Sequence, residues 1–211
     1  MATANSTRPR NPEATRKRIL HAATKVFAKS GFDGARVDVI AQHSKINKQL
    51  LYHHFGNKDQ LFTAVLENAY RNFRQQEASL DLSGLRADAC VMKLVEFTWT
   101  YYIHNPEFIR LLNSENQLEA RHLKASPSTR GINASHVALL KRIVAQGKRE
   151  KSLRADLDPV ELSINIASLG FFYLMNRFTL STVFRRDLGS RRNLNARLAG
   201  MKDAIARWIA P

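Results

Sequence analysis

Hydrophobic residues recur at helical spacing through almost the whole of this 211-residue sequence. The first clear case is a stripe along one helix face, made of Ile19, Ala22, Ala23, Val26 and Phe27. No segment shows a convincing alternation of polar and apolar residues, the pattern typical of a half-buried strand. The sequence therefore predicts an all-α protein.

Residues that favour helix ends divide this pattern into separate helices. Asn11 and Pro12 favour a helix start and Gly31 a helix end, because Asn caps free amides, Pro tolerates the first position and Gly ends helices. Two short helices are expected at about residues 37–43 and 47–54, and Asn57 caps a longer fourth helix. One further helix is expected to end at about residue 104, and another to begin at residue 106. A loop at residues 125–131 is expected to precede a helix over residues 132–150. The last two helices are expected from residue 159 to about 184 and over residues 194–208.

These breaks divide the chain into three parts. Residues 1–11 are expected to form a flexible basic arm, and residues 12–56 a three-helix head. Residues 57–211 are expected to form a bundle of about six helices, joined to the head by a connecting helix at residues 57–80.

The charge of the chain is strongly positive. It has 33 Lys and Arg against 18 Asp and Glu, a formal net charge of +15. Residues 1–60 hold 11 basic and 4 acidic residues, a balance of +7 in less than a third of the chain. Such an excess favours a polyanionic partner, either nucleic acid or an anionic membrane surface. The polyanion is expected to bind this N-terminal segment.

The sequence favours neither a membrane nor a secreted location. Residues 162–176, the longest uncharged stretch of the apolar C-terminal region, are too few to span a bilayer, and residues 1–11 hold no apolar signal segment. The single Cys90 excludes an internal disulfide framework, fits a reducing compartment and is expected to be a small buried hydrophobe. A cytoplasmic protein without a membrane partner is expected.

Two short helices joined by a tight turn within the most basic segment indicate a helix-turn-helix. Such a motif must hold a rigid, exposed helix that enters the major groove of DNA. Its core side is expected to hold Ile19, Ala23, Phe27, Val37, Ile40, Leu51 and Phe55. Its exposed side is expected to hold Lys45, Asn47, Lys48, Gln49, Tyr52, His53 and His54.

Residues 14–66 resemble the N-terminal DNA-binding domain of TetR-type transcriptional regulators. The resemblance rests on Ile19-Leu20-His21-Ala22-Ala23, Phe27, Gly31-Phe32, Val37, Ile40-Ala41, Leu51-Tyr52-His53-His54-Phe55, Asn57-Lys58 and Leu61-Phe62. It implies a three-helix head on a helical ligand-binding domain, a homodimer, and a small-molecule effector that usually releases DNA.

The resemblance also implies a set of DNA contacts. Asn47 starts the recognition helix, while Lys48 or Gln49 reads a purine edge. Lys58 contacts a backbone phosphate, aided by the dipole of the helix that it starts. The expected contacts are Arg36, Lys45, Asn47, Lys48, Gln49, Tyr52, His53 and Lys58. Arg8 and Arg10 of the arm are expected to enter a minor groove.

Three positions depart from the family pattern. Lys45 replaces the usual turn glycine, so either it adopts a left-handed conformation or the turn differs. Leu50 replaces a Ser or Thr and either meets a thymine methyl or faces the core. The usual cap of the second helix is lost around Ala35-Arg36, where Arg36 is expected to contact phosphate instead.

Some of these residues also have structural interpretations. Tyr52 and Phe55 are equally well explained as packing residues that close the head onto the fourth helix. His53 and His54 do not predict a metal site, because adjacent helical residues point about 100° apart and no third ligand lies nearby in the sequence. Neither a metal nor a cofactor is expected.

Aromatic residues of the bundle either line an effector cavity or fill an ordinary core. Spacing alone favours the core, whereas the resemblance favours a pocket for some of them. The expected ligand-binding residues are Phe97, Tyr101, Phe108, Leu112, Asn116, Phe171, Met175 and Arg177. An acidic effector is expected to pair with Arg177 or His122.

The last helix carries an apolar seam made of Leu194, Leu198, Met201, Ile205 and Trp208. Either it packs within the chain, or it joins the preceding helix in a four-helix dimer interface; the resemblance favours a homodimer on a palindromic operator. The expected function is a ligand-responsive repressor, and the alternative is a non-specific nucleic-acid-binding protein. An enzyme is not expected, since the sequence has no Gly-rich phosphate loop, metal-ligand spacing or nucleophile–base signature.

Overall fold

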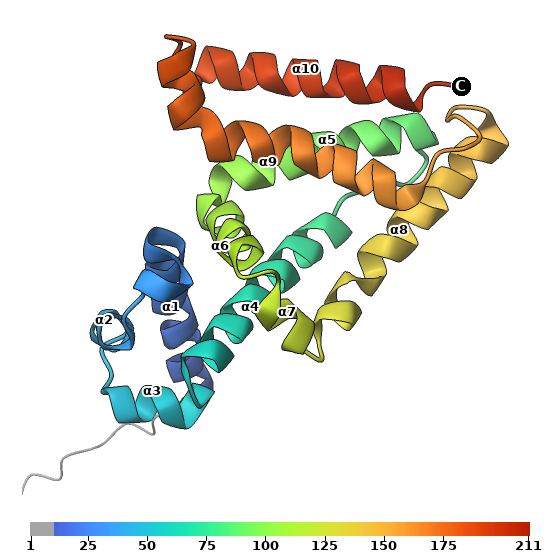
Figure 1. Cartoon of the computed structure of the whole chain (residues 1–211). Coiled ribbons are helices and arrows are strands. Elements are labelled where there is room, and N and C mark those ends of the chain that lie inside the picture. Colours follow the sequence, from blue (N-terminus) through green and yellow to red (C-terminus); the bar gives the residue numbers. More distant parts are fainter. Residues whose placement is uncertain (1–10) are drawn as a thin grey trace, which may run out of the picture. The chain divides into compact units, whose positions relative to one another are not determined.

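The computed structural model describes residues 11–211, and every regular element in that range is an α-helix (Figure 1). The all-α prediction is confirmed. The expected arm, with Arg8 and Arg10, lies almost wholly outside the described residues. The helices are α1 (Pro12–Gly34), α2 (Val37–His43), α3 (Lys48–Phe55), α4 (Lys58–Ala78), α5 (Ala87–His104), α6 (Pro106–Gln117), α7 (Arg121–Ala125), α8 (Thr129–Glu150), α9 (Pro159–Val183) and α10 (Arg191–Ile209).

Short polar side chains start several of these helices. The Asn11 side chain accepts from the amides of Glu13 and Ala14 at 3.0 and 3.2 Å. Asn57 accepts from the Gln60 amide at 2.8 Å, and Asp158 caps α9 from 2.7 and 2.9 Å. Each bond satisfies an amide that has no partner within its own helix. The predicted starts of α1, α4 and α9 are therefore confirmed.

Two details of the helices differ from expectation. Gly31 has a φ of 68° and interrupts α1 where its end was predicted, but one more turn follows as far as Gly34. The loop expected at residues 125–131 was wrong in part, because α8 begins at Thr129 and α7 ends at Ala125. The polar composition there, with Pro127 and Gly131, was misleading: the Ile132 amide bonds to the Ser128 carbonyl at 3.0 Å and closes a first helical turn.

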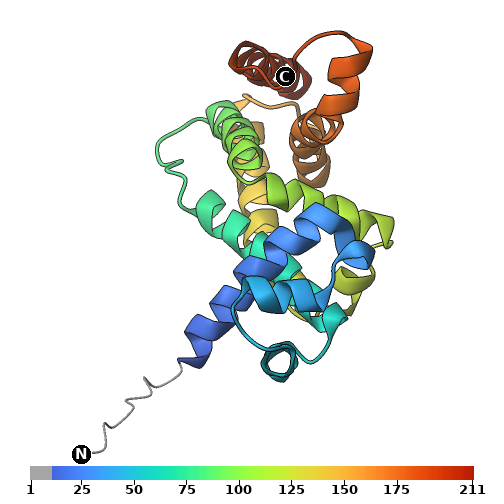
Figure 2. The same cartoon turned by 90° about the vertical axis from the view of Figure 1, so that its left-hand side faces the viewer.

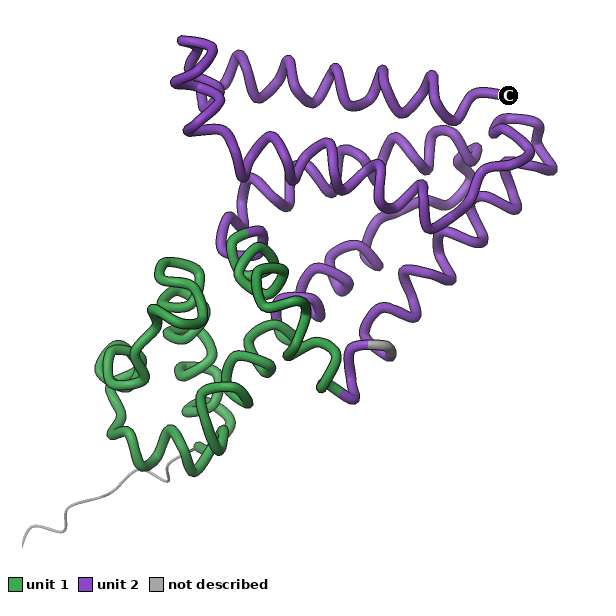
Figure 3. Tube along the Cα trace, in the orientation of Figure 1, with its two compact units in different colours: residues 1–68, 110–126 green, residues 69–109, 127–211 purple. Residues whose placement is uncertain are grey.

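The chain forms two compact units (Figure 3). Unit 1 comprises Met1–Asn68 and Arg110–Ser126, and unit 2 comprises Ala69–Ile109 and Pro127–Pro211. The boundary cuts both α4 and α6. The head therefore forms one unit with the end of α6 and with α7, a segment that is far from it in the sequence.

Aromatic rings fill the core of unit 1 beside the aliphatic residues of the head. The Phe27 and Phe62 rings lie 4.8 Å apart, and those of Phe32 and Phe62 lie 5.2 Å apart. The predicted core side of the helix-turn-helix is confirmed, because all seven residues assigned to it are buried.

A buried polar contact holds residues 110–126 within unit 1. Glu115 accepts from the amides of His122 and Leu123 at 2.7 and 2.9 Å, and its other oxygen lies 2.7 Å from His122 Nδ1. His122 Nε2 lies 3.3 Å from Asp59 Oδ1 in the first turn of α4. The His122 ring packs 4.7 Å from the Phe32 ring. We call Glu115, His122 and Asp59 the clasp.

Helix α5 is central in unit 2 and packs against α8, α9 and α10. At Gly170 of α9, a Cβ atom would meet Tyr102 at 3.3 Å and Trp99 at 3.5 Å, so a residue without a side chain allows the close approach of α9 to α5. Met201 and Ile205 of the predicted α10 seam are 0% and 2% exposed. These two seam residues therefore pack within the chain itself.

Cys90 also lies in unit 2 and is 2% exposed, as predicted. Its burial raises the pKa of the thiol. Between residues 11 and 211, no helix combines the length and apolarity that crossing a membrane requires.

Candidate nucleic-acid interface

Helices α2 and α3 form a helix-turn-helix. Helix α2 is seen end-on in Figure 1 and from the side in Figure 2, while α3 shows the reverse, so the two helices cross at a steep angle. The turn is held by bonds from the Lys45 amide to the Gln42 carbonyl and from the Ile46 amide to the Ala41 carbonyl, both 3.1 Å. Buried Ser44 adds a 2.7 Å bond from its hydroxyl to the Ile40 carbonyl.

Lys45 has a φ of 55°, which is the left-handed conformation. Of the two alternatives for this turn, the structure therefore shows the first, a lysine in the left-handed conformation. A non-glycine residue in this region costs about 1 kcal/mol because its Cβ approaches the following carbonyl. The loss of the α2 cap is also confirmed: Arg36 makes no side-chain capping bond and is exposed.

One face of α3 is buried and the other is open. Leu51 and Phe55 point into unit 1. Arg16 of α1 holds the end of α3, because its guanidinium donates to the His54 carbonyl at 3.2 Å and lies 4.3 Å from the Phe55 ring centroid. The opposite face keeps Lys48, Gln49 and His53 exposed, and Asn47 caps the helix by accepting from the Leu50 amide at 2.7 Å.

A groove of about 780 Å³ runs between α1 and the start of α3. It is lined by Thr15, Arg18, Lys45, Ile46, Asn47, Gln49, Leu50 and His53. Four of the predicted DNA contacts thus share one concave surface. Leu50 lines the groove and is half-buried, which is compatible with a contact to a thymine methyl.

Arg18 and Thr15 are residues of the groove that the sequence interpretation missed. Arg18 is exposed and belongs to the basic run Arg16-Lys17-Arg18. That run indicates charge, but only the packing of α1 beside α3 shows which of its three members faces the groove.

Lys48 forms an ion pair with Asp38 of α2. The Nζ–Oδ1 distance is 3.0 Å, and the Lys48 Nζ lies 6.0 Å from the Tyr52 ring centroid. The hydrogen bond and charge of Asp38 raise the pKa of Lys48. A recognition-helix lysine is therefore held by a neighbouring carboxylate, which the motif does not predict.

Lys58 holds the start of α4 to the end of α1. Its ammonium donates to the Asp33 carbonyl at 3.2 Å and lies 4.7 Å from the Phe32 ring centroid. An ammonium has three donor hydrogens, so a phosphate contact remains compatible with this bond. The phosphate contact of Lys58 stays a prediction, as do all the other predicted DNA contacts.

Three of the predicted ligand-binding residues lie close together in unit 2. Phe97 and Tyr101 line a groove of about 360 Å³ with Leu80, Thr100 and Asn105 among its other residues. The Phe108 ring lies 5.5 Å from that of Tyr101. Burial raises the pKa of Tyr101 to about 12, so this phenol is neutral at physiological pH.

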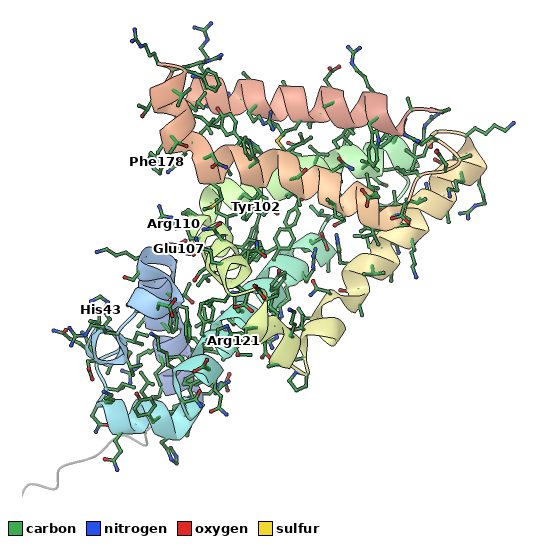
Figure 4. All side chains as sticks on the ribbon, in the orientation of Figure 1. His43, Tyr102, Glu107, Arg110, Arg121 and Phe178 are labelled. Carbon is green, nitrogen blue, oxygen red and sulfur yellow. The ribbon has the colours of Figure 1, made fainter. Side chains whose placement is uncertain are left out.

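The other predicted ligand-binding residues are not among those that line this groove. Leu112 and Asn116 belong to unit 1. Phe171 and Met175 are half-buried on α9, and the Arg177 guanidinium lies 4.6 Å from the ring of Phe178, which is labelled in Figure 4. Their roles in binding stay predictions.

A half-buried polar cluster around the buried Glu77 of unit 2 escaped the sequence interpretation. Arg74 donates to both oxygens of Glu77 at 3.0 and 3.1 Å, and His136 Nδ1 lies 2.9 Å from Glu77. The other His136 nitrogen lies 2.8 Å from the Ser163 hydroxyl. These residues come from α4, α8 and α9, so no local pattern could have grouped them.

Comparisons with known proteins agree with the helix-turn-helix. A family profile described as "Bacterial regulatory proteins, tetR family" matches residues 19–65, and one described as "Tetracyclin repressor-like, C-terminal domain" matches residues 88–205. The HTH-type transcriptional repressor NicS of Pseudomonas putida is 37% identical over 96% of this chain and 95% of its own length. The HTH-type transcriptional repressor SCO4008 of Streptomyces coelicolor is 38% identical over 49% of this chain and 50% of its own length.

Solved structures share the fold at lower identity. A transcriptional regulator of Streptomyces coelicolor superposes with a TM-score of 0.72 at 22% identity, over 92% of this chain and 98% of its own. The regulator FadR of Bacillus subtilis, solved with stearoyl-CoA, gives 0.69 at 16% identity, over 92% and 99%. The two profiles and the nearly full-length likeness to NicS place this chain in the tetR family of bacterial regulatory proteins.

Proposed function

We propose that the chain represses transcription in the cytoplasm as a homodimer, which binds a palindromic operator and leaves it when a small molecule binds. The groove between α1 and α3 carries this proposal. It presents the first turn of an exposed helix together with Arg18, Lys45 and His53. A positively charged surface around an exposed helix is what the major groove and its flanking phosphates require.

The side chains of this groove suit two kinds of contact. Asn47 and Gln49 carry amides, which can bond adenine in a bidentate way and so distinguish bases. Arg18 and Lys45 carry charges that suit phosphates, which fix the position of the protein without reading sequence. Residues 12–56 act as the DNA-binding head in this proposal, and residues 57–211, with residues 57–80 as the connecting helix, bind the effector and the second subunit.

The dimer is proposed to form through α9 and α10. The outer side of α9 exposes large apolar side chains, with Ile164 at 52%, Phe172 at 59% and Phe178 at 65%. Helix α10 adds small exposed residues, Ala199 and Gly200, which permit a close approach of a second helix pair. Large exposed apolar patches usually mark interaction surfaces. A two-fold dimer would place its recognition helices about 34 Å apart, one turn of DNA.

The effector is proposed to bind unit 2 in the groove lined by Phe97 and Tyr101. Apolar walls with a few polar groups are typical of small-molecule sites, and Thr100 and Asn105 supply such groups here. The complex of FadR with stearoyl-CoA supports small-molecule binding in this fold, and the naming of NicS as a repressor supports repression.

Selection of binding sites from random duplex DNA tests this function. We expect the recovery of one palindromic consensus, because two identical heads related by a two-fold axis read two half-sites. A pool that stays unenriched while binding remains salt-sensitive would instead favour the second candidate, a non-specific nucleic-acid-binding protein.

A further inference from the structure

The ion pair between Asp38 and Lys48 is not needed to hold the helix-turn-helix together. Its side chains are 58% and 50% exposed, and exposed pairs contribute little to stability. Helices α2 and α3 are already joined by the bonds of the turn and by buried Ile40 and Leu51. The fold therefore does not require this carboxylate.

A carboxylate at this position is unfavourable for contacts with phosphate. It lies 3.0 Å from a cation of the recognition helix, where it offsets that charge and repels phosphates. A free lysine is a flexible point charge that binds any phosphate within reach. To bind a phosphate, the Lys48 ammonium has to leave Asp38, and the carboxylate then lies unpaired beside the DNA.

The same carboxylate gives Lys48 a fixed position. One hydrogen of the ammonium is directed to Asp38, and two remain for other acceptors. Guanine offers two neighbouring acceptors, O6 and N7, in the major groove. A lysine held in place can bond such a base edge without giving up its carboxylate partner.

We propose that Asp38 is a specificity-determining residue, which holds Lys48 toward a base edge and disfavours its binding to phosphates of other sequences. This proposal rests on the proposed function, since it requires an operator. Asp38 acts through Lys48 and is a positioning residue. It lowers the affinity for non-operator DNA and so raises the ratio of operator to non-operator affinity.

The test compares the full-length protein with Asp38→Asn on two duplexes, the consensus recovered by selection and a shuffled sequence of the same composition. Fluorescence anisotropy at several salt concentrations gives the affinities. We expect the variant to bind the shuffled duplex about fivefold more tightly, with a salt dependence steeper by about one unit, because one more cation is free for phosphate. The affinity for the consensus should stay within about twofold, so the ratio falls.

Two further variants isolate the pair. Glu13→Gln removes another carboxylate that lies 3.0 Å from a lysine of the head, but this lysine, Lys17, is on α1 and does not line the groove; its affinity ratio should match the wild type. In a Lys48→Met background, Asp38→Asn should no longer change the ratio. Thermal unfolding of each variant checks that the fold is retained.

The outcomes separate two failures. If the wild type binds both duplexes equally, the proposed function fails. If the wild type discriminates and Asp38→Asn keeps the same ratio, or weakens both duplexes equally, the role assigned to Asp38 is wrong. A fall in the ratio that persists in the Lys48→Met background would also overturn it, because Asp38 would then act without Lys48.

Discussion

Single cations hold the ends of two helices in unit 1. Arg16 donates to the last turn of α3 and Lys58 to the last turn of α1, and each lies over a phenylalanine ring. Carbonyls at a helix C-terminus carry partial negative charge, so a cation is favourable there. Replacing either residue would change folding and DNA binding together, which makes Arg18 the better probe of the groove.

Arg18→Ala is expected to weaken binding to every duplex and to lower the salt dependence of the affinity by about one unit, because one phosphate contact is lost. Lys17→Ala is the matched control, since Lys17 is the adjacent cation on α1 but pairs with Glu13 and does not line the groove. Anisotropy titrations at increasing salt measure both variants. Equal slopes for the two variants would exclude Arg18 from the interface.

Residues whose roles are local could be predicted from the sequence. Asn47 and Asp158 cap helices because of bonds to amides two or three residues away, and the pattern around them is enough to predict this. Arg18 and Asp38 instead depend on another helix, because Arg18 shares a groove with residues of α3 and Asp38 pairs with Lys48 of α3. Their positions depend on how the helices pack, so the sequence pattern gave no means of selecting them.

Among the elements, the turn between α2 and α3 carries a conformational cost. Lys45 at φ 55° keeps a cation in the groove at the expense of backbone strain. Helix α2, which lacks a side-chain cap, adds to the low intrinsic stability of this motif. Under the proposed function, this backbone strain is the cost of a cation that faces the DNA.

Lys45→Gly is expected to stabilise the protein by about 1 kcal/mol, because glycine adopts a positive φ without strain. The same change should weaken DNA binding, since it removes a cation. Lys45→Ala removes the cation and keeps the strain, so it should weaken binding without stabilising the fold. Urea unfolding and anisotropy measure the two effects, and equal stability of the two variants would contradict this account.

The hydrophobic period of the sequence predicted the long helices, but it did not predict the short α7. Five residues are too few to show a period, and α7 begins after two residues, Glu119 and Ala120, with positive φ. Its place in the fold depends on His122, whose bonds to Glu115 and proximity to Asp59 join residues far apart in the sequence. The sequence suggested His122 as a partner for an acidic effector, and it gave no sign that the side chain is buried beside Glu115.

For the whole molecule, the sequence predicted an N-terminal head followed by a bundle, whereas the compact units are interleaved along the chain. Helical period predicts elements, and it contains no information about which distant segments pack together. The apolar seam of α10 shows the same limit. Its spacing predicted a packing face but not what that face packs against, which for Met201 and Ile205 is their own unit.

The dimer proposal predicts the effect of a charge on the outer side of α9. Ile164→Asp is expected to convert the dimer to monomers and to lower operator affinity by about 100-fold or more, because two linked heads bind far more tightly than one. Asn72→Asp, at an exposed position of α4 and outside α9 and α10, is a control of equal charge. Sedimentation velocity and anisotropy measure the outcome, and an Ile164→Asp protein that stays dimeric would move the interface elsewhere.

The clasp limits how this protein can be recombined with its relatives. A head transplanted by cutting the chain at residue 68 would leave behind Glu115 and His122, so Phe32 and Phe62 would lose the ring that covers them. In a chimaera, the compatible unit of exchange is the N-terminal segment together with residues 110–126. Regulators assembled from two parents should therefore inherit both segments from the same parent, because a segment far along the chain completes the core of the head.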